Sequence, residues 1–253
     1  GGRTRAMWRA KLNPRKVAPY LFLLPFLVIF AAFQIYPLIY GVIISFYRFR
    51  GLAERQFVGL DNYVRLLNNP QFYQALENTT YYTLGTLIIL IPIPVILAVL
   101  LNSKLTRASS VYQTASFLPA LTSLVVVGAV FRLLLDERGG LVNAALQAIG
   151  VAPQKWLNSA ALVIPSLLIL AFWRWAGINI IYFLSGLTAI PQELYEAAEI
   201  DGATGLRRFW HITLPLLKPV IVFVTIISTI GGYQLFTEVY VLWPQGGTPG
   251  NAG

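Results

Sequence analysis

The sequence predicts an all-α protein that crosses a membrane several times. Of its 253 residues, 57% are hydrophobic and only 11% are charged, whereas a typical soluble domain carries about 25% charged residues. The chain has no cysteine and a formal net charge of +9. Disulfides and thiolate metal sites are therefore excluded, and we interpret the basic residues as signals of membrane topology rather than as a nucleic-acid surface.

Five apolar segments approach the length of about 20 residues that a helix needs to cross a bilayer. The first, second, third and fifth are bounded by charged residues, and the fourth is interrupted by Arg174. A single such segment fits a buried soluble core, but five in succession predict five transmembrane helices. The segments lie within Val17–Tyr47, Asn78–Ser103, Ala108–Phe131, about Ala160–Ser185 and Pro219–Thr237.

The distribution of basic residues predicts the orientation. The tail of residues 1–16 is dense in Arg and Lys, which are retained on the cytoplasmic side. A cytoplasmic N-terminus places residues 48–77 and 136–155 outside, each with a short helical pattern such as Leu141–Ile149, and places residues 186–215 inside. We find no separate soluble domain, so residues 1–253 are predicted to form one transmembrane domain. Because five spans leave the C-terminus outside in a Gly- and Pro-rich turn, we expect a sixth helix beyond it.

The cytoplasmic connection, residues 186–215, predicts a helix–turn–helix outside the membrane. Pro191 suits the first turn of a helix, and Gly202 can adopt the left-handed conformation that ends one. Thr204 is then the cap of a second helix over Leu206–Ile212, which leads into the fifth span at Pro215.

The same connection contains fixed residues at fixed spacing: Glu-Ala-Ala, two residues, Asp-Gly-Ala, five residues, Phe, and then Ile-x-Leu-Pro after two more. The sequence therefore resembles the permeases of binding-protein-dependent ABC importers, whose Glu-Ala-Ala loop has this pattern. Two shorter segments, Gly59–Tyr63 and Gly246–Pro249, resemble the sugar branch, which includes the maltose and glycerol-phosphate permeases. The residues that fit the main pattern are Glu196, Ala197, Ala198, Asp201, Gly202, Ala203, Phe209, Ile212, Leu214 and Pro215.

The resemblance implies the partners and the mechanism. The loop would form a coupling helix that docks on a separate ATPase subunit, and two such ATPases would hold the ATP and Mg²⁺, so that this chain binds no cofactor. A second permease, expected to be a paralogue, completes a heterodimer in the prokaryotic plasma (inner) membrane. An extracytoplasmic binding protein delivers a sugar or oligosaccharide, which crosses by alternating access. The alternative is the same architecture importing glycerol phosphate, a polyamine or another small solute.

A membrane enzyme or a passive channel is a different class of function. The sequence contains no Gly-x-x-x-x-Gly-Lys-Ser/Thr loop and no His-Glu-x-x-His motif, and its one histidine is His211. We therefore predict that the chain is not an enzyme and does not hydrolyse ATP itself.

Candidate solute contacts lie in the fourth and fifth segments, because polar groups inside a membrane span usually face a cavity or a partner. In the permeases that the sequence resembles, solute contacts come from the corresponding parts of these two helices. As alternatives, Trp173 and Trp175 belong to an interfacial aromatic belt, and Arg174 snorkels or pairs with Glu238. An Arg174 that faces the pathway would favour an anionic solute such as a sugar phosphate. The candidates are Trp173, Arg174, Tyr233, Gln234 and Thr237.

Overall fold

The computed structural model describes residues 14–50, 54–102, 109–244 and 247. Most of the basic N-terminal tail, and the predicted Gly246–Pro249 motif except Gly247, lie outside the described residues. The chain divides into two compact units, residues 1–72 and 73–253, which we describe one at a time.

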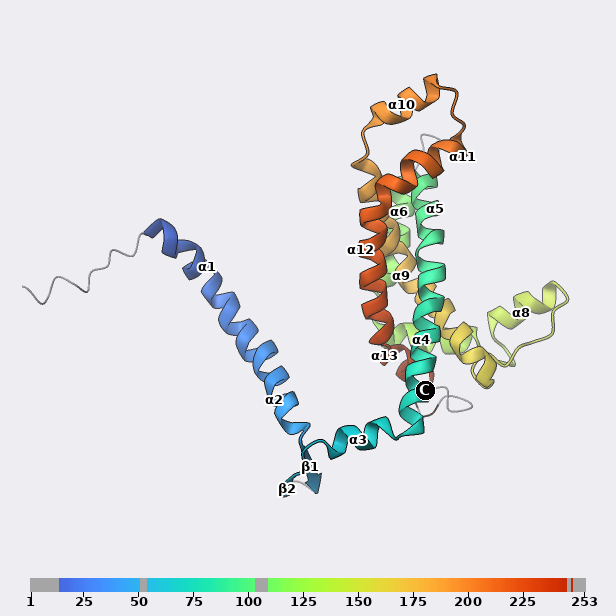
Figure 1. Cartoon of the computed structure of the whole chain (residues 1–253). Helices are drawn as coiled ribbons and strands as arrows, with labels where there is room; N and C mark the ends of the chain where they lie inside the picture. Colours follow the sequence, from blue (N-terminus) through green and yellow to red (C-terminus); the bar gives the residue numbers. More distant parts are fainter. Residues whose placement is uncertain (1–13, 51–53, 103–108, 245–246, 248–253) are drawn as a thin grey trace, which may run out of the picture. The chain divides into compact units, whose positions relative to one another are not determined.

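The first unit contains one apolar helical span and a hairpin (Figure 1). Helix α1 (Pro14–Phe30), the π-helix η1 (Ala31–Ile35) and α2 (Tyr36–Ile44) run on from one another. Residues 18–44 of this helix are long and apolar enough to cross a membrane. None of its most apolar residues is buried within the unit, so the span offers all its faces to lipid or to other helices.

A short hairpin follows this span and was not predicted from the sequence. Strands β1 (Tyr47–Arg50) and β2 (Glu54–Phe57) pair antiparallel, with Tyr47 opposite Phe57. The Asn62 side chain, in α3 (Asp61–Leu67), donates hydrogen bonds to the carbonyl oxygens of Ser45 (2.8 Å) and Tyr47 (3.0 Å). These bonds fix the hairpin between the span and α3.

The second unit contains three further long apolar helices. They are α4 (Pro70–Leu90) with α5 (Pro92–Asn102), η2 (Ala160–Leu162) with α9 (Val163–Thr188), and α11 (Gly205–Arg208) with η3 (Phe209–Thr213) and α12 (Leu214–Tyr233). The second and fifth spans begin well before the apolar segments that predicted them. The charged residues that had served as boundaries, Glu77 and Lys218, are exposed within continuous helices.

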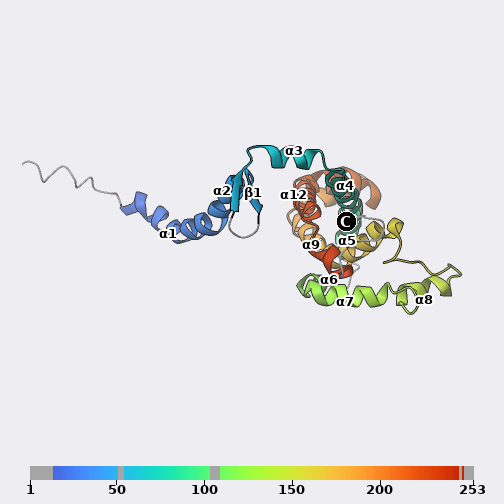
Figure 2. The same cartoon turned by 90° about the horizontal axis from the view of Figure 1, so that it is seen from below.

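The third predicted span is not one straight helix, which corrects the sequence-based expectation. It consists of α6 (Ser109–Leu121) and α7 (Leu124–Leu134), and the two halves meet at an angle of 99°. Seen from below, α7 runs at right angles to the long helices and lies along one side of the bundle (Figure 2). The described residues thus contain four membrane-length helices, or five if the bent pair counts as one span.

Helix α9 lies at the centre of the second unit and contributes to both clusters of buried side chains. One cluster joins α9 to α4, α7 and α13 (Thr237–Leu242) through residues such as Leu170 and Phe131. The other joins α9 to α5 and α12 through residues such as Phe183 and Leu217. Where α9 crosses α6, a Cβ atom on Gly177 would lie only 1.7 Å from the Ser116 carbonyl oxygen, so the two backbones touch.

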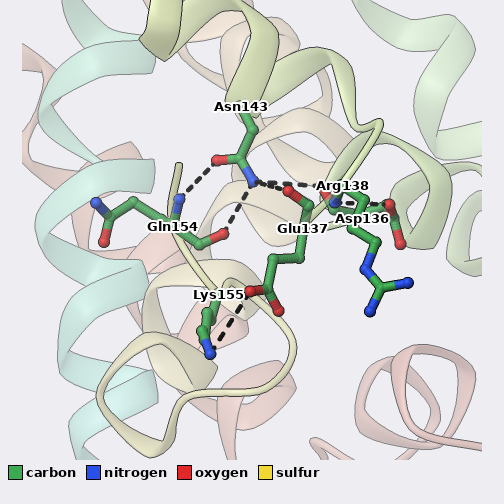
Figure 3. A network of polar contacts seen from close by, with 6 residues as sticks. All are labelled: Asp136, Glu137, Arg138, Asn143, Gln154 and Lys155. Carbon is green, nitrogen blue, oxygen red and sulfur yellow. Dashed lines mark hydrogen bonds and ion pairs between the residues drawn. The ribbon is translucent and has the colours of Figure 1, made fainter. Parts of the chain in front are cut away.

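The loop between α7 and α9 contains α8 (Leu141–Ala148), as predicted, and is organised around Asn143 (Figure 3). The buried Asn143 side chain donates to the carbonyl oxygens of residues 136, 137 and 154 and accepts from the Gln154 amide and the Trp156 indole. At the start of the loop, the backbone N–H groups of Gly139 and Arg138 bond the Asp136 carboxylate and lower its pKa. Polar groups therefore hold this loop together.

Candidate functional site

The predicted helix–turn–helix is present at the end of the second unit opposite α8 (Figure 1). Helix α10 spans Gln192–Ile200 and begins one residue later than expected, with Pro191 as the residue before its first turn. Glu193 lies in that first turn, where a carboxylate is favoured by the helix dipole. One turn on, the Glu196 carboxylate accepts a hydrogen bond of 2.9 Å from the Gln192 side chain, which keeps the carboxylate on the surface of the helix.

The turn after α10 has the conformation that the sequence predicts. Gly202 has φ +73°. Its N–H donates to the Glu199 carbonyl (3.0 Å), and the Ala203 N–H donates to the Ala198 carbonyl (2.8 Å), which is the Schellman pattern of a helix end. The Thr204 hydroxyl then accepts from the Arg207 N–H at 3.4 Å and caps α11.

Two side-chain contacts tie α10 to the helix that follows. The Tyr195 hydroxyl lies 2.9 Å from the hydroxyl of Thr213, the buried last residue of η3, directly before α12. Farther out, Arg208 and Glu199 form an ion pair of 3.3 Å. A displacement of α10 would therefore pull directly on the long helix behind it.

Among the charged residues of this helix–turn–helix, several large apolar side chains are exposed although they lie beyond the ends of the spans. Ile200 is 87% exposed, Leu206 is 71% exposed and Trp210 is 56% exposed. Phe209, by contrast, is half-buried and packs against the α5–α9–α12 cluster. We call the exposed residues Ile200, Leu206 and Trp210, together with the small, exposed Ala197 about one turn before Ile200, the coupling surface. Exposed apolar side chains of this kind are typical of a surface that a partner covers.

A cavity of about 200 Å³ lies between α4, α9, α12 and α13. It is a candidate solute site, since it combines aromatic rings with hydrogen-bonding groups. Trp175 and Tyr182 supply rings, and Ser228 and Glu238 supply polar atoms. Its lining residues are Tyr82, Thr86, Leu90, Trp175, Ile178, Asn179, Tyr182, Ile227, Ser228, Gly231, Gly232 and Glu238.

None of the five residues predicted to contact solute lines this cavity. Trp173 lines a different, mainly apolar cavity and packs against Phe131 with ring centroids 5.5 Å apart. The Tyr233 hydroxyl lies 3.1 Å from that of Thr80. Gln234 and Thr237 are exposed at the end of α12 and the start of α13. The role of these residues in solute contact stays a prediction.

Arg174 points to the bend between α6 and α7. Its Nη1 atom donates a hydrogen bond of 2.8 Å to the Thr122 carbonyl, and its guanidinium lies 5.1 Å from the centre of the Trp175 ring. Thr122 lies where α6 has ended, so its carbonyl has no helical partner and attracts a cation. Within the described residues Arg174 forms no ion pair with Glu238, which overturns that alternative.

Comparison with known proteins decides the family. Residues 90–250, which include the whole Glu-Ala-Ala loop, match the family described as "Binding-protein-dependent transport system inner membrane component". The chain belongs to this family. It is a multi-pass protein of the inner membrane, and the resemblance predicted from the loop is confirmed. The family description, a membrane component of a transport system, agrees with the prediction that the chain is not an enzyme.

Several relatives are permeases of sugar transporters. The chain is 51% identical over 247 residues to the arabinooligosaccharides transport system permease protein AraP of Bacillus subtilis, covering 97% of this chain and 78% of that protein. It is 40% identical over 235 residues to the lactose transport system permease protein LacF of Rhizobium radiobacter, covering 92% and 78%. A chain of a bacterial ABC transporter that imports the acidic polysaccharide alginate has a similar structure, with a TM-score of 0.77 and 28% identity over 90% of this chain and 77% of that one. The predicted polytopic helical fold is thus confirmed.

Proposed function

We propose that this chain is the permease subunit of an ABC importer for an oligosaccharide, with arabinose-containing oligosaccharides as the first candidates. The observation that carries the proposal is the 51% identity to AraP, which extends over 97% of the chain. The aromatic and hydroxyl groups of the α4–α9–α12–α13 cavity support it, because the apolar faces of sugars stack on aromatic rings and their hydroxyls need hydrogen-bonding partners.

We assign the coupling surface to an ATP-binding-cassette subunit, which would hold the ATP and Mg²⁺. The exposed apolar side chains of this surface and the rigid turn at Gly202 support the assignment. Closure of two ATPases would push on α10, and the Tyr195–Thr213 contact would carry the movement into α12.

Two other partners follow from the same proposal. A second permease, expected to be a paralogue, would cover exposed apolar side chains of α12 such as Val222 and Ile226. An external binding protein would deliver the solute at the opposite end, near α8. In support, a solved alginate transporter similar to this chain is in complex with an alginate pentasaccharide-bound periplasmic protein. This orientation places the α10 end, with Arg207 and Arg208, in the cytoplasm, as the retention of basic residues there favours.

Copurification with a tagged ATPase encoded in the same operon tests the coupling surface. Gly202→Val is the test variant, because a β-branched residue is strongly disfavoured at φ +73°. Gly202→Asn is the matched control, since asparagine tolerates this conformation. Retention of the ATPase by the unchanged chain and by Gly202→Asn, with loss in Gly202→Val, is expected. If the unchanged chain retains no ATPase, the importer assignment fails.

Uptake by the reconstituted transporter tests the solute. Proteoliposomes containing both permeases and the ATPases would be supplied with binding protein loaded with arabino-oligosaccharides, lactose, glycerol phosphate or a polyamine. ATP-dependent uptake of an oligosaccharide supports the proposal. Uptake of only glycerol phosphate or the polyamine would refute the sugar assignment and leave the architecture intact.

A further inference from the structure

The candidate solute cavity contains one carboxylate. Among its lining residues, all of which belong to the described part of the chain, Glu238 is the only acidic residue, and none is basic. Glu238 lies in the first turn of α13 and is half-buried. A carboxylate beside a membrane-spanning bundle is unfavourable unless it faces water, a partner or a solute.

No described cation neutralises this carboxylate. The ion pairs among the described residues are Arg48–Asp61, Lys155–Glu137 and Arg208–Glu199, so none includes Glu238. The nearest basic residue along α9, Arg174, uses its guanidinium on the Thr122 carbonyl and does not line the cavity. The Asn179 amide group is likewise engaged, since its Nδ2 atom donates to the Leu90 carbonyl at 2.9 Å.

The cavity therefore has a negative charge and hydrogen-bond acceptors where a solute would lie. Hydroxyl groups of a neutral sugar can donate to a carboxylate in a strong, charge-assisted hydrogen bond. A carboxylate on the solute, as in a uronic-acid residue, would instead meet a like charge in a site of low dielectric constant. Glu238 would thus attract neutral oligosaccharides and repel those that carry a carboxylate, and such a combination of attraction and repulsion is a common basis of specificity.

From this arrangement, and resting on the proposed function, we propose that the Glu238 carboxylate makes the cavity select uncharged oligosaccharides over oligosaccharides that carry carboxylate groups. The sequence had suggested the opposite preference, through an Arg174 facing the pathway. The position of Arg174 at the α6–α7 bend removes that cation from the cavity and leaves Glu238 to set its charge.

Direct binding to the assembled transporter tests the proposal. The complex of both permeases and the ATPases is purified without the binding protein, so that the selectivity of the binding protein does not enter. Equilibrium dialysis then compares a radiolabelled neutral arabino-oligosaccharide with a uronic-acid oligosaccharide of the same length. The neutral compound is expected to bind about tenfold or more tightly, because one like-charge contact at an effective dielectric constant of about 20 is sufficient for this ratio.

Glu238→Gln keeps the shape of the side chain and removes its charge, and it should reduce the preference to about twofold or less. Glu77→Gln is the matched control. Glu77 is an exposed carboxylate of α4 that does not line the cavity, and its removal should leave the preference unchanged. Equal binding of both compounds to the unchanged complex, or a preference that persists in Glu238→Gln, would overturn the charge selection alone. A neutral oligosaccharide that does not bind at all would overturn the solute site itself and the selection with it.

Discussion

Gly177→Ala provides a stringent test of the packing between α9 and α6. The added Cβ atom would lie 1.7 Å from the carbonyl oxygen and 2.4 Å from the carbonyl carbon of Ser116. Atoms of this kind are in favourable contact at about 3.5 Å, and the obstacle is backbone, which cannot rotate away. Helix α6 would therefore have to move from α9 by more than about 1 Å.

The cost of this movement has two parts. Overpacking of a filled interface costs about 1–3 kcal/mol. The displacement would also break the hydrogen bond from Arg174 to the carbonyl at the end of α6, and a hydrogen bond to a charged group is worth about 1.5–3 kcal/mol. Against these stands a gain of about 1 kcal/mol from alanine within a helix. A net loss of about 3 kcal/mol lowers the melting temperature of a chain of this size by about 6–12 °C.

Thermal unfolding of the purified protein in detergent measures this loss. Gly205→Ala is the matched control, because the same Cβ atom at the start of α11 would meet no atom within 4 Å, and it should be neutral or slightly stabilising. A Gly177→Ala protein as stable as the Gly205→Ala protein would refute the close approach of α6 and α9.

Four further changes have defined outcomes. Asn143→Ala leaves several part-buried partners without hydrogen bonds, at up to about 1–3 kcal/mol each, and should make the loop after α7 sensitive to limited proteolysis. Tyr195→Phe removes a hydrogen bond to Thr213 worth about 1 kcal/mol, and should retain the ATPase in copurification while increasing the ATP hydrolysed per solute imported. Arg174→Met loses about 1.5–3 kcal/mol of hydrogen bonding but removes a charge that costs about 2.5–3.5 kcal/mol inside a membrane. The net change in stability should therefore lie between a loss of about 0.5 and a gain of about 2 kcal/mol. Distance measurements between spin labels on added cysteines should show a broader range of angles between α6 and α7. The pKa of Asp136 is lowered because two backbone N–H groups of its own turn donate hydrogen bonds to its carboxylate. The ionised carboxylate therefore stabilises the loop at pH values above its ordinary pKa, and this stabilisation is lost as the pH falls through the lowered pKa. Asp136→Asn should reduce the acid sensitivity of the loop, measured by hydrogen exchange.

Each of these four predictions can be contradicted by its measurement. Unchanged proteolysis of Asn143→Ala would mean that the loop does not depend on its central amide. Full coupling in Tyr195→Phe would show that force passes from α10 to α12 by another contact. An unaltered bend angle in Arg174→Met would show that the guanidinium does not hold the bend, and an identical acid response in Asp136→Asn would assign the proton to a different group.

The sequence predicted the coupling loop well because its conformation depends on local chemistry. Glycine, the residue at position 202, is one of the few residue types that readily adopt a positive φ, and the side chain of Thr204 is of a type that caps helices. Both effects act within four residues of the chain. The family pattern could therefore be placed on a helix, a turn and a second helix before any tertiary contact was known.

The limits of the spans were harder to predict because hydropathy reports the environment of a side chain and not the continuity of the backbone. Glu77 and Lys218 are exposed, so their charges remain in water or at its boundary while the helix continues past them. Pro119 lies inside α6 three residues before the break between α6 and α7 and disfavours a regular helix there, but Thr122 and Ser123 are only weak helix breakers. The break also depends on partners distant in sequence, above all Arg174 and Gly177 of α9.

The candidate cavity shows the same limit. Trp173, Arg174 and Trp175 are consecutive, and composition alone cannot say which of them faces a given neighbour. In the structure Trp175 shares a face of α9 with Asn179 and lines the cavity, whereas Trp173 lines another one. The rotation of α9 that decides this is set by its packing against α4, α5, α6 and α12.

The π-helix at Phe209–Thr213 has a consequence for how the length of this segment is constrained. A π-turn holds one residue more than an α-turn, and one residue rotates everything that follows by about 100° about the helix axis. This insertion contains Trp210 of the coupling surface and precedes the face of α12 that presents Ser228 and Gly232 to the cavity. Deleting any one residue from the segment would preserve its hydrophobicity and its helical character, yet would turn that face more than a quarter of a circle away. The number of residues in Phe209–Thr213, more than their identity, therefore fixes the rotation of α12 about its axis relative to the coupling surface.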